Sequence, residues 1–536
     1  MRADLPSSRF ATEEEQVYYA VKFGSGDLNP HYFLHPPFFA YILFGIYGAT
    51  FVVGRLAGWF HGTADFERLF FTDPTLFFLI ARTFVLLLAL GGLLIFYRLA
   101  KRLYRRESVA LLATGFLSAS TLHVIAAHYA NTDIPMMVLA LLAFLMIVQV
   151  LREGTLTQYA LAGLCIGLAT ATKYNAAWLG VALMLAHVIR GLQARSPWGP
   201  LITSRKLWLG LALVGLGFLM GCPFALVDFQ TFFASFQKLR WELMTLDYHF
   251  ASYRAQGHGP LFLLTSVFPS MVGVPLTVIC ILVLLYALWR RQPEDLLLAG
   301  FFMTFAAYLG SWNIIKPRYF IYVLPMILLL AARWCVVLAD RLRSSRLRTA
   351  VLLAAWAALV VAPWQDTIQF DRLVAQTPAP VKARAWVEAH VPSGTGIATF
   401  AGIPLMPNEI SIQRQLEEAS AKRIGKGLRL QRLSHYVASM PATYDIWQLP
   451  FPWREDYDET DFDFAKHRLE GVRYFLVTDE VEHYLAEPSR FRVQVAYYDA
   501  IRSTCQLVQS FRQRRPMVDP GLGDEEYVLV YKLRNG

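Results

Sequence analysis

Acidic side chains beside apolar segments are the residues of this sequence whose types and positions could support catalysis. Glu13, Glu14 and Glu15 form one run near the start, and Asp133 lies in a short polar stretch between two apolar segments. A charge near hydrocarbon is costly, so carboxylates at such positions point to function. Two carboxylates that meet at one membrane face could act as a general base and as an orienting partner for a hydroxyl or a phosphate. Two simpler alternatives stay open, a helix N-cap at Asp133 and a solvated charge cluster at the glutamates.

Basic side chains next to other apolar segments could bind an anion. Lys173 lies in a turn between two such segments, Lys316 and Arg318 directly precede another, and His35 precedes a proline-led one. Together these groups could neutralise a phosphate or a pyrophosphate. The alternative for each of them is an aliphatic stem at a helix end that carries its charge to the lipid head groups.

The composition indicates a membrane protein. Of the 536 residues, 55% are hydrophobic and 17% are charged, whereas about a quarter are charged in an average soluble domain. A disordered chain, a nucleic-acid-binding domain and a disulfide scaffold are therefore excluded as first interpretations. The net charge of +10 is expected to lie in cytoplasmic loops, so it does not indicate a nucleic-acid partner. The five cysteines are scattered and form no CxxC pair, which makes a structural zinc site unexpected.

From residue 77 onward, ten apolar segments have about the length that crosses the hydrocarbon core of a bilayer. They cover residues 77–97, 109–126, 133–151, 158–172, 174–190, 207–226, 265–289, 296–313, 318–338 and 347–363. The sequence therefore predicts a polytopic α-helical membrane protein with about ten spans and additional interfacial helices.

Basic loops orient these spans. The loops at 98–107, 190–206, 290–291 and 341–348 are rich in Lys and Arg and alternate along the chain, so all four are expected in the cytoplasm. The turns at 127–132 and 314–317 and the amphipathic segment 227–260 are then outside. We expect three regions: a first extracytoplasmic loop with interfacial helices (1–76), a transmembrane domain (77–364) and a soluble extracytoplasmic α/β domain (365–536).

The segment 37–59 is ambiguous. It could be a full span, or an interfacial helix or hairpin, and Arg55 and the many aromatic residues favour the interfacial position. If residues 1–35 lie outside, a helix from the cytoplasm should precede them, and the sequence as printed begins without one. We therefore expect that the first transmembrane helix is missing.

The C-terminal region has a mixed charge and the pattern of a small α/β domain. Residues 381–392 read as a helix, and 480–500 as another. The apolar runs beginning at 397, 472 and 526 read as strands. The stretch 405–460 is expected to be looser. We interpret this region as a recognition or support domain, because it contains no motif of a soluble enzyme.

The order of these motifs resembles the membrane glycosyltransferases of the GT-C fold. Within them it is similar to glycosyltransferase family 39, which contains the aminoarabinose transferases and the protein O-mannosyltransferases. The resemblance covers most of residues 10–370. It is carried by an acidic pair followed by a tyrosine, a Thr-Asp-x-Pro turn, a Thr-Lys turn and a Pro-Arg-Tyr sequence. The C-terminal domain matches only in placement and character.

The resemblance implies roles for matching residues. The family's Asp-Glu-x-x-Tyr motif reads Glu14-Glu15-x-x-Tyr18 here, and the frame could also slip to Glu15 with Tyr19. Histidine stands at position 35, where the family has a lysine before proline. The implied catalytic residues are Glu14, Glu15 and Asp133, and the implied substrate-binding residues are Tyr18, His35, Lys173, Lys316, Arg318 and Tyr319.

The resemblance further implies an inverting glycosyltransferase in the cell (inner or plasma) membrane. It would take a sugar from a polyprenyl-phosphate carrier and pass it to a lipid, glycan or protein acceptor at the outer face. Glu14 would deprotonate the acceptor hydroxyl, and Lys173, Arg318 and His35 would stabilise the leaving phosphate without a metal or another cofactor. The alternative is a non-catalytic or transport membrane protein that handles lipid-linked sugars. The scarcity of ionisable residues within the spans favours the enzyme.

Overall fold

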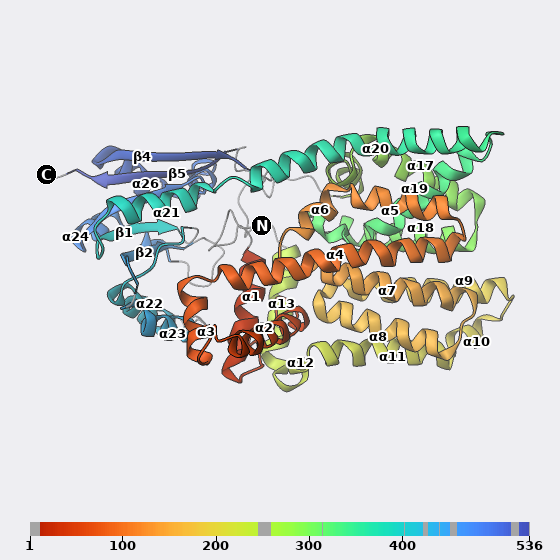
Figure 1. Cartoon of the computed structure of the whole chain (residues 1–536), viewed down its shortest axis with the longest axis horizontal. Helices are drawn as coiled ribbons and strands as arrows, with labels where there is room; N and C mark the ends of the chain where they lie inside the picture. Colours follow the sequence, from red (N-terminus) through yellow and green to blue (C-terminus); the bar gives the residue numbers. More distant parts are fainter. Residues whose placement is uncertain are drawn as a thin grey trace.

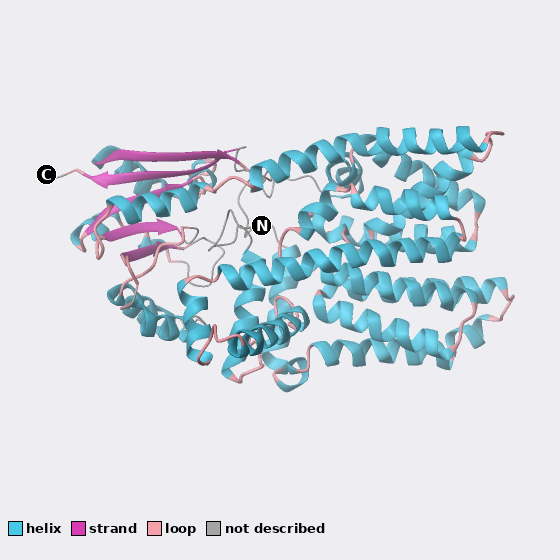
Figure 2. Cartoon of the chain, in the orientation of Figure 1, coloured by secondary structure: helices cyan, strands magenta, loops and turns pink. Residues whose placement is uncertain are grey.

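The computed structural model describes residues 11–244, 259–312, 315–400, 403–421, 427–438, 440–450, 458–515 and 525–534. These residues form a long helical bundle and a domain with a five-stranded sheet at one end of it (Figures 1 and 2). The architecture expected from the sequence, apolar helices followed by a C-terminal α/β domain, is therefore present.

Three helices near the start lie at the end of the bundle that faces the sheet domain (Figure 1). They are α1 (Ala11–Lys22), α2 (Phe38–Leu56) and α3 (Thr63–Thr72). Because α2 is one continuous helix of 19 residues, the hairpin alternative for the segment 37–59 is wrong.

The bundle consists of long apolar helices that run side by side, with short helices and turns between them (Figure 1). The first group is α4 (Thr75–Tyr104), α5 (Glu107–Ser118), α6 (Thr121–Ala127), α7 (Asp133–Arg152), α8 (Leu156–Thr172), η2 (Tyr174–Trp178), α9 (Leu179–Gln193), α10 (Trp198–Ile202), α11 (Arg205–Gly221), α12 (Phe224–Val227) and α13 (Phe229–Met244). The second group is α15 (Gly259–Phe262), the π-helical turn η3 (Leu263–Val267), α16 (Phe268–Val272), α17 (Val274–Arg290), α18 (Pro293–Gly310), η4 (Pro317–Phe320), α19 (Leu324–Ala339) and α20 (Ser345–Val374).

Within the described residues, six helices are long and apolar enough to cross a membrane, or up to eight when bent pairs count as single spans. α2 is one of the six by this criterion. The segment 109–126 is bent by 63° between α5 and α6, and the segment 265–289 by 120° before α17. The apolar segment predicted at 265–289 therefore contains a sharp bend, and it counts as one span only if the bent pair is taken together. The break falls at Gly273, whose φ of +80° favours glycine.

Helices α8 and α11 approach each other closely because both present glycines at their contact. A Cβ atom on Gly163 would lie 2.1 Å from the Gly210 carbonyl oxygen, and one on Gly167 would lie 2.3 Å from the Val214 carbonyl oxygen. Small residues four apart on one helix are the usual means of bringing two membrane helices into backbone contact. Side-chain packing alone could not produce this separation.

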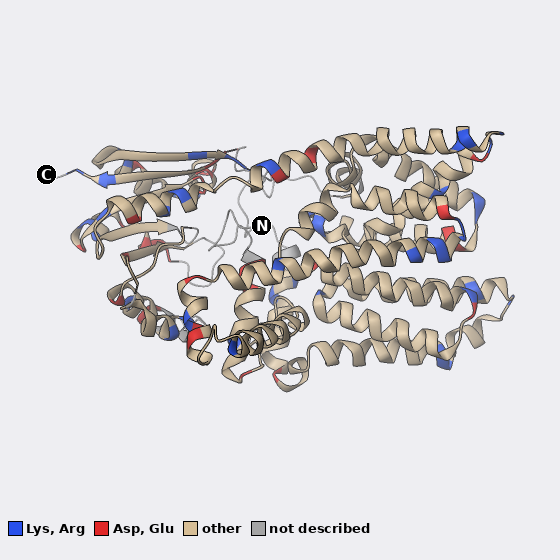
Figure 3. Ribbon diagram, viewed as in Figure 1, with Lys and Arg blue, Asp and Glu red and all other residues tan. Residues whose placement is uncertain are grey.

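The predicted cytoplasmic turns lie together at the end of the bundle away from the sheet domain. The Arg152 guanidinium donates to the Arg102 carbonyl oxygen (2.6 Å), and Arg190 donates to the Arg152 carbonyl oxygen (2.6 Å). The Lys206 ammonium donates to the Gly154 carbonyl oxygen (2.8 Å). In Figure 3 the Lys and Arg residues of the bundle gather mainly at this end. The arrangement agrees with loops that alternate between two faces.

The C-terminal domain is a mixed sheet with the strand order β2-β1-β3-β5-β4. β1 pairs in parallel with β2 and β3, and β5 pairs antiparallel with β3 and β4. The strands are β1 (Gly396–Phe400), β2 (Asp445–Leu449), β3 (Val472–Thr478), β4 (Cys505–Arg514) and β5 (Glu525–Leu533). The helices are α21 (Ala379–His390), α22 (Glu409–Ala421), α23 (Gly427–Val437), α24 (Phe464–Leu469), α25 (Val481–Leu485) and α26 (Arg492–Thr504), with the turn η5 (Glu459–Asp461).

Helices cover both faces of the sheet, which explains the apolar runs in its central strands. Tyr474 and Leu476 pack with α21, whereas Phe475 and Val477 pack in a second core with α26. The strands expected at 397, 472 and 526 are confirmed as β1, β3 and β5. The expectation of a looser stretch at 405–460 is wrong for its described part, which contains α22, α23 and β2.

Candidate functional site

Several turns meet at the end of the bundle that faces the sheet domain. Hydrogen bonds join them: the Tyr174 hydroxyl donates to the Phe33 carbonyl oxygen (2.7 Å), and the Tyr322 hydroxyl donates to the Asn175 carbonyl oxygen (2.7 Å). The loop before α2, the turn after α8 and the start of α19 are therefore adjacent. These turns carry most of the residues singled out from the sequence.

Asp133 and Lys173 form a direct ion pair at this end. Asp133 is the first residue of α7, and its backbone N–H donates to Oδ1 of Asn131 (2.9 Å). Its carboxylate is therefore available to Lys173, and the N-cap alternative is wrong, since the N-cap position belongs to Thr132. The Asp133 side chain is 4% exposed and that of Lys173 is 15% exposed. Such a pair can hold its charges only because each compensates the other.

Two residues of η4, Arg318 and Tyr319, lie next to Lys173. The Lys173 ammonium lies 5.7 Å from the ring centre of Tyr319, a cation–π contact. Burial lowers the pKa of Lys173, Asp133 opposes that effect, and the nearby positive charge of Arg318 adds to the lowering. The Nε atom of Arg318 is buried and has no hydrogen-bond partner among the described residues. Lys173 and Arg318 thus form a site with more positive charge than Asp133 alone neutralises.

Glu15 and His35 form a second polar pair. Nδ1 of His35 lies 3.0 Å from Oε2 of Glu15, and both side chains are 22% exposed. Oε1 of Glu15 is buried and has no hydrogen-bond partner among the described residues. This half-buried carboxylate therefore has one oxygen held by histidine and one that can accept a proton.

Glu13 and Arg82 form a buried ion pair that the sequence analysis did not identify. Nε and Nη2 of Arg82 donate to the two oxygens of Glu13 at 2.8 and 2.7 Å, and both side chains are at most 1% exposed. The Ala130 backbone N–H donates to the same carboxylate (2.7 Å). Glu13 therefore fixes α1 to α4 and to the turn that precedes Asp133. An arginine inside an apolar span requires a partner, and this requirement was the available signal.

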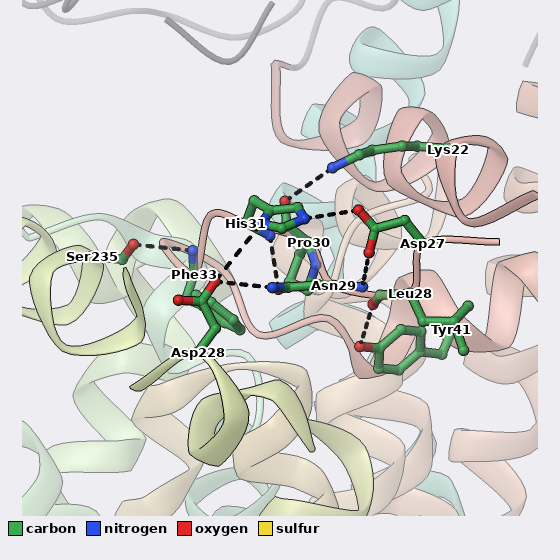
Figure 4. A network of polar contacts seen from close by, with 10 residues as sticks. All are labelled: Lys22, Asp27, Leu28, Asn29, Pro30, His31, Phe33, Tyr41, Asp228 and Ser235. Atoms are coloured by element: carbon green, nitrogen blue, oxygen red, sulfur yellow. Dashed lines mark hydrogen bonds and ion pairs between the residues drawn. The ribbon is translucent and has the colours of Figure 1, made fainter. Parts of the chain in front are cut away.

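The loop that carries His35 is tied to α12 and α13 by a polar network (Figure 4). The Asn29 amide donates to Asp228 (2.9 Å), and the Phe33 backbone N–H donates to the Ser235 hydroxyl (3.2 Å). Nε2 of His31 lies 2.8 Å from Oδ2 of Asp27, and the hydrogen bond with His31 lowers the pKa of Asp27. The network holds the loop in the position from which His35 reaches Glu15.

The sheet domain reaches this end of the bundle through α23. The Arg429 guanidinium lies 5.6 Å from the ring centre of Tyr18, and Arg432 pairs with Glu67 of α3 (3.3 Å). The ring of Tyr436 stacks on that of Phe71, with ring centres 5.8 Å apart. Tyr18 was expected at the site, but the residues of α23 were not, because amphipathic spacing in α23 does not reveal which surface it contacts.

The remaining predicted residues, Glu14 and Lys316, lie at the same end of the bundle. Glu14 is exposed on the first turn of α1, and Lys316 is half-buried before η4. No hydrogen bond or ion pair joins Glu15 to Asp133 among the described residues. The structure thus places the predicted residues in two groups, Asp133 with Lys173, Arg318 and Tyr319, and Glu15 with His35.

Metal ligands do not cluster at the site. Across the described ranges, no group of three or more His, Cys, Asp or Glu side chains could hold a metal ion. His31 and His35, four residues apart, each take a different carboxylate. The fixed positive charge of the site comes from Lys173 and Arg318.

Residues 78–220 match the family model described as dolichyl-phosphate-mannose-protein mannosyltransferase. Over these residues the resemblance expected from the short motifs is confirmed. A comparison with curated protein sequences finds no match.

Solved structures of three proteins are similar to the chain over nearly its whole length. ArnT from Cupriavidus metallidurans bound to undecaprenyl phosphate has a TM-score of 0.49 and 12% identity, over 98% of this chain and 95% of that chain. The Archaeoglobus fulgidus oligosaccharyltransferase tethered with an acceptor peptide has a TM-score of 0.49 and 11% identity, over 98% and 72%. The arabinofuranosyltransferase AftD from Mycobacteria has a TM-score of 0.39 and 15% identity, over 95% and 36%.

Proposed function

We propose that the protein is a glycosyltransferase that moves a sugar from a polyprenyl-phosphate carrier to an acceptor hydroxyl at the outer membrane face. One observation carries this proposal. The segment that matches the mannosyltransferase family model contains both Asp133 and Lys173, and these two residues contact each other at the site. A pairing of this kind, next to Arg318, suits a ligand whose negative charge grows during reaction.

Lys173 and Arg318 bind the carrier phosphate in this proposal. The bond from the anomeric carbon to the phosphate oxygen breaks, and the oxygen keeps the electron pair. Two fixed cations in a partly buried site stabilise this charge more strongly than they would in water. Asp133 holds the Lys173 ammonium in place and keeps it protonated before the phosphate arrives.

Glu15 acts as the general base. The acceptor oxygen forms the new bond to the anomeric carbon, and its proton passes to Oε1 of Glu15, which has no hydrogen-bond partner within the described part of the chain. His35 orients the carboxylate through Oε2. This assignment follows the slipped frame of the acidic motif, Glu15 with Tyr19, because Glu14 is exposed whereas Glu15 is partly desolvated.

The test compares Glu15→Gln with Glu14→Gln in the purified chain in nanodiscs. The donor is polyprenyl-phosphate mannose with a radiolabelled sugar, a membrane lipid extract supplies acceptors, and free polyprenyl phosphate is measured. Loss of a general base lowers transfer by about 10²–10⁴-fold, so we expect this loss for Glu15→Gln and near-normal turnover for Glu14→Gln. The reverse ranking would move the base to Glu14.

A second pair of variants tests the phosphate site. Lys173→Met removes a cation that contacts Asp133, and Arg318→Lys keeps a charge but loses the planar guanidinium. We expect Lys173→Met to abolish detectable transfer and Arg318→Lys to retain part of it. The unmodified chain should also be tested with the mannose, arabinose and aminoarabinose donors. If it binds these donors but releases no polyprenyl phosphate from any of them, a transport or non-catalytic protein would be favoured.

A further inference from the structure

A surface groove follows the last turns of α20, where this helix meets β4. Its volume is about 540 Å³. Seven residues line it: Gln365, Ile368, Gln369, Arg372, Leu373, Gln376 and Arg514. Gln513 of β4 donates to the Leu373 carbonyl oxygen (3.5 Å), which joins the two walls. The groove is thus built from the bundle and the sheet domain together.

The lining has a positive charge and several hydrogen-bond donors. It contains two arginines and three glutamines and no carboxylate. Glu525 lies opposite Arg514 in the β4–β5 register, but its carboxylate accepts from Arg512 (3.2 Å). Such a surface is complementary to an anion with several acceptor oxygens.

The groove begins where the apolar part of α20 ends. Directly before the groove, Val361 and Trp364 are 50% and 54% exposed. Ile368, which lines the groove on the side nearest these residues, is 42% exposed. Val361, Gln365, Ile368 and Arg372 follow one another along one side of the helix. An apolar surface therefore leads into a cationic one along a single face. Tryptophan at this boundary is typical of the membrane–water interface.

The opposite side of α20 packs on the turn that carries Asp133. Phe370 and Val374 form a buried cluster with Tyr129, and Asp371 lies 3.1 Å from Nε2 of His128. The groove and the candidate functional site therefore occupy two sides of the same helical segment and are separate surfaces.

We propose that this groove binds the phosphate-bearing head group of a membrane lipid. The two guanidinium groups contact the phosphate, the glutamine amides contact neighbouring hydroxyl or ester oxygens, and the acyl chain follows Val361 and Trp364. The lipid is an amphiphile because the groove continues into an exposed apolar face. This proposal does not depend on glycosyl transfer, and its test measures binding alone.

Native mass spectrometry of the full chain in detergent provides the test, with dioctanoyl phosphatidylglycerol as the probe. Two double variants are compared, each of which removes two positive charges: Arg372→Gln with Arg514→Gln in the groove, and Arg492→Gln with Arg502→Gln on α26. The second pair is exposed on α26, towards the other end of β4, and serves as the matched control. We expect the groove double variant to bind one lipid molecule with about tenfold lower affinity, and the control double variant to bind it with unchanged affinity. Equal effects of the two pairs would overturn the proposal.

Two further arms identify the source of the phosphate. Dioctanoyl phosphatidylcholine, whose head group is zwitterionic, should bind at least several-fold more weakly. Glycerol phosphate, which lacks acyl chains, should not displace the lipid at equal concentration. Trp364→Ala should lower the affinity for the lipid but not the affinity for glycerol phosphate. Full displacement by glycerol phosphate would show a site for soluble anions and would overturn the lipid assignment.

Discussion

Removing one partner of a buried ion pair costs more free energy than replacing both partners with uncharged residues. Glu13 and Arg82 are both almost fully buried, and the carboxylate accepts hydrogen bonds from Nε and Nη2 of Arg82 and from the Ala130 N–H. Removal of either charge leaves the other buried without its ion-pair partner. The pair therefore stabilises the position of α1 rather than contributing a proton-transfer group.

We expect Arg82→Met to destabilise the protein by about 3–5 kcal/mol because it removes the arginine that compensates the buried Glu13 carboxylate. The double variant Glu13→Gln with Arg82→Met should recover a substantial part of this loss, since no unpaired charge remains. The measurement is the thermal midpoint of the purified chain in detergent. A double variant that is less stable than Arg82→Met alone would contradict this account.

A buried histidine makes the sheet domain sensitive to acid. Burial, followed by the positive charge of Lys466, lowers the pKa of His467 to about 4, and its Nδ1 lies 2.9 Å from the Tyr497 hydroxyl. The unfolded chain has the ordinary pKa near 6.5, so it binds the proton first as the pH falls. Stability from neutral His467 is therefore complete above about pH 6.5 and is lost as the pH falls towards 4.

Unfolding of the full chain at pH 7.5 and pH 5 checks this prediction. We expect the sheet domain to lose up to about 2 kcal/mol of stability over this interval, and His467→Gln to flatten the dependence. His390→Gln is the control, because His390 is exposed on α21. An equal pH dependence in the unmodified chain and in His467→Gln would exclude His467 as the cause.

At the scale of elements, α23 is the part of the sheet domain that reaches the candidate functional site. Arg429 lies over Tyr18 of α1, whereas Arg432, three residues later, pairs with Glu67 of α3. Both contacts join the same two parts of the molecule. They differ in that only Tyr18 belongs to the predicted substrate-binding residues.

We expect Arg429→Ala to raise KM for the polyprenyl-phosphate donor by about twofold to fivefold, with little change in kcat, because an exposed cation–π contact contributes about 0.5–1 kcal/mol. Arg429→Lys should restore part of the affinity. Arg432→Ala should leave KM unchanged and lower stability slightly. Identical kinetic effects of Arg429→Ala and Arg432→Ala would indicate that α23 acts only by holding the domain in place.

The sequence predicts elements well where one physical constraint dominates. Central strands β1 and β3 are buried on both faces, so their apolar runs are visible in the sequence. The edge strands β2 and β4 were missed, because β2 is short and the exposed side of β4 carries polar residues. The apolar run at 265–289 indicates that the segment lies in an apolar environment, but it does not indicate the direction of the helix axis. The sharp bend at Gly273 was therefore not predicted.

The candidate site was predictable as a set of residue types but not as a set of pairs. Asp133 and Lys173 are 40 residues apart, and Glu13 and Arg82 are 69 apart. Which carboxylate takes which cation depends on how α1, α7 and the turn after α8 pack. Glu14, the base expected from the sequence, is exposed, whereas Glu13 is buried and Glu15 is half-buried.

At the scale of the whole molecule, two sets of turns lie at opposite ends of the bundle. The basic turns are joined at one end, and α1, the start of α7 and the sheet domain lie at the other (Figure 1). Since positive loops remain in the cytoplasm, we expect the sheet domain outside.

Single cysteines in a cysteine-free variant test this orientation. Ser503→Cys is exposed on α26, and Ser345→Cys is exposed at the start of α20, next to the basic turn. In right-side-out vesicles, we expect a membrane-impermeant maleimide to label Ser503→Cys at once and Ser345→Cys only after permeabilisation. The opposite pattern would invert the topology and place the candidate functional site at the cytoplasmic face.

The glycine contact between α8 and α11 restricts how a long-chain lipid can enter the protein. The backbones of these helices touch, so no side chain can rotate aside to create a passage between them. Opening this seam would require both helices to separate along their length. In the proposed reaction, we therefore expect a polyprenyl tail to enter from the bilayer between a different pair of helices, with α8 and α11 remaining in contact throughout.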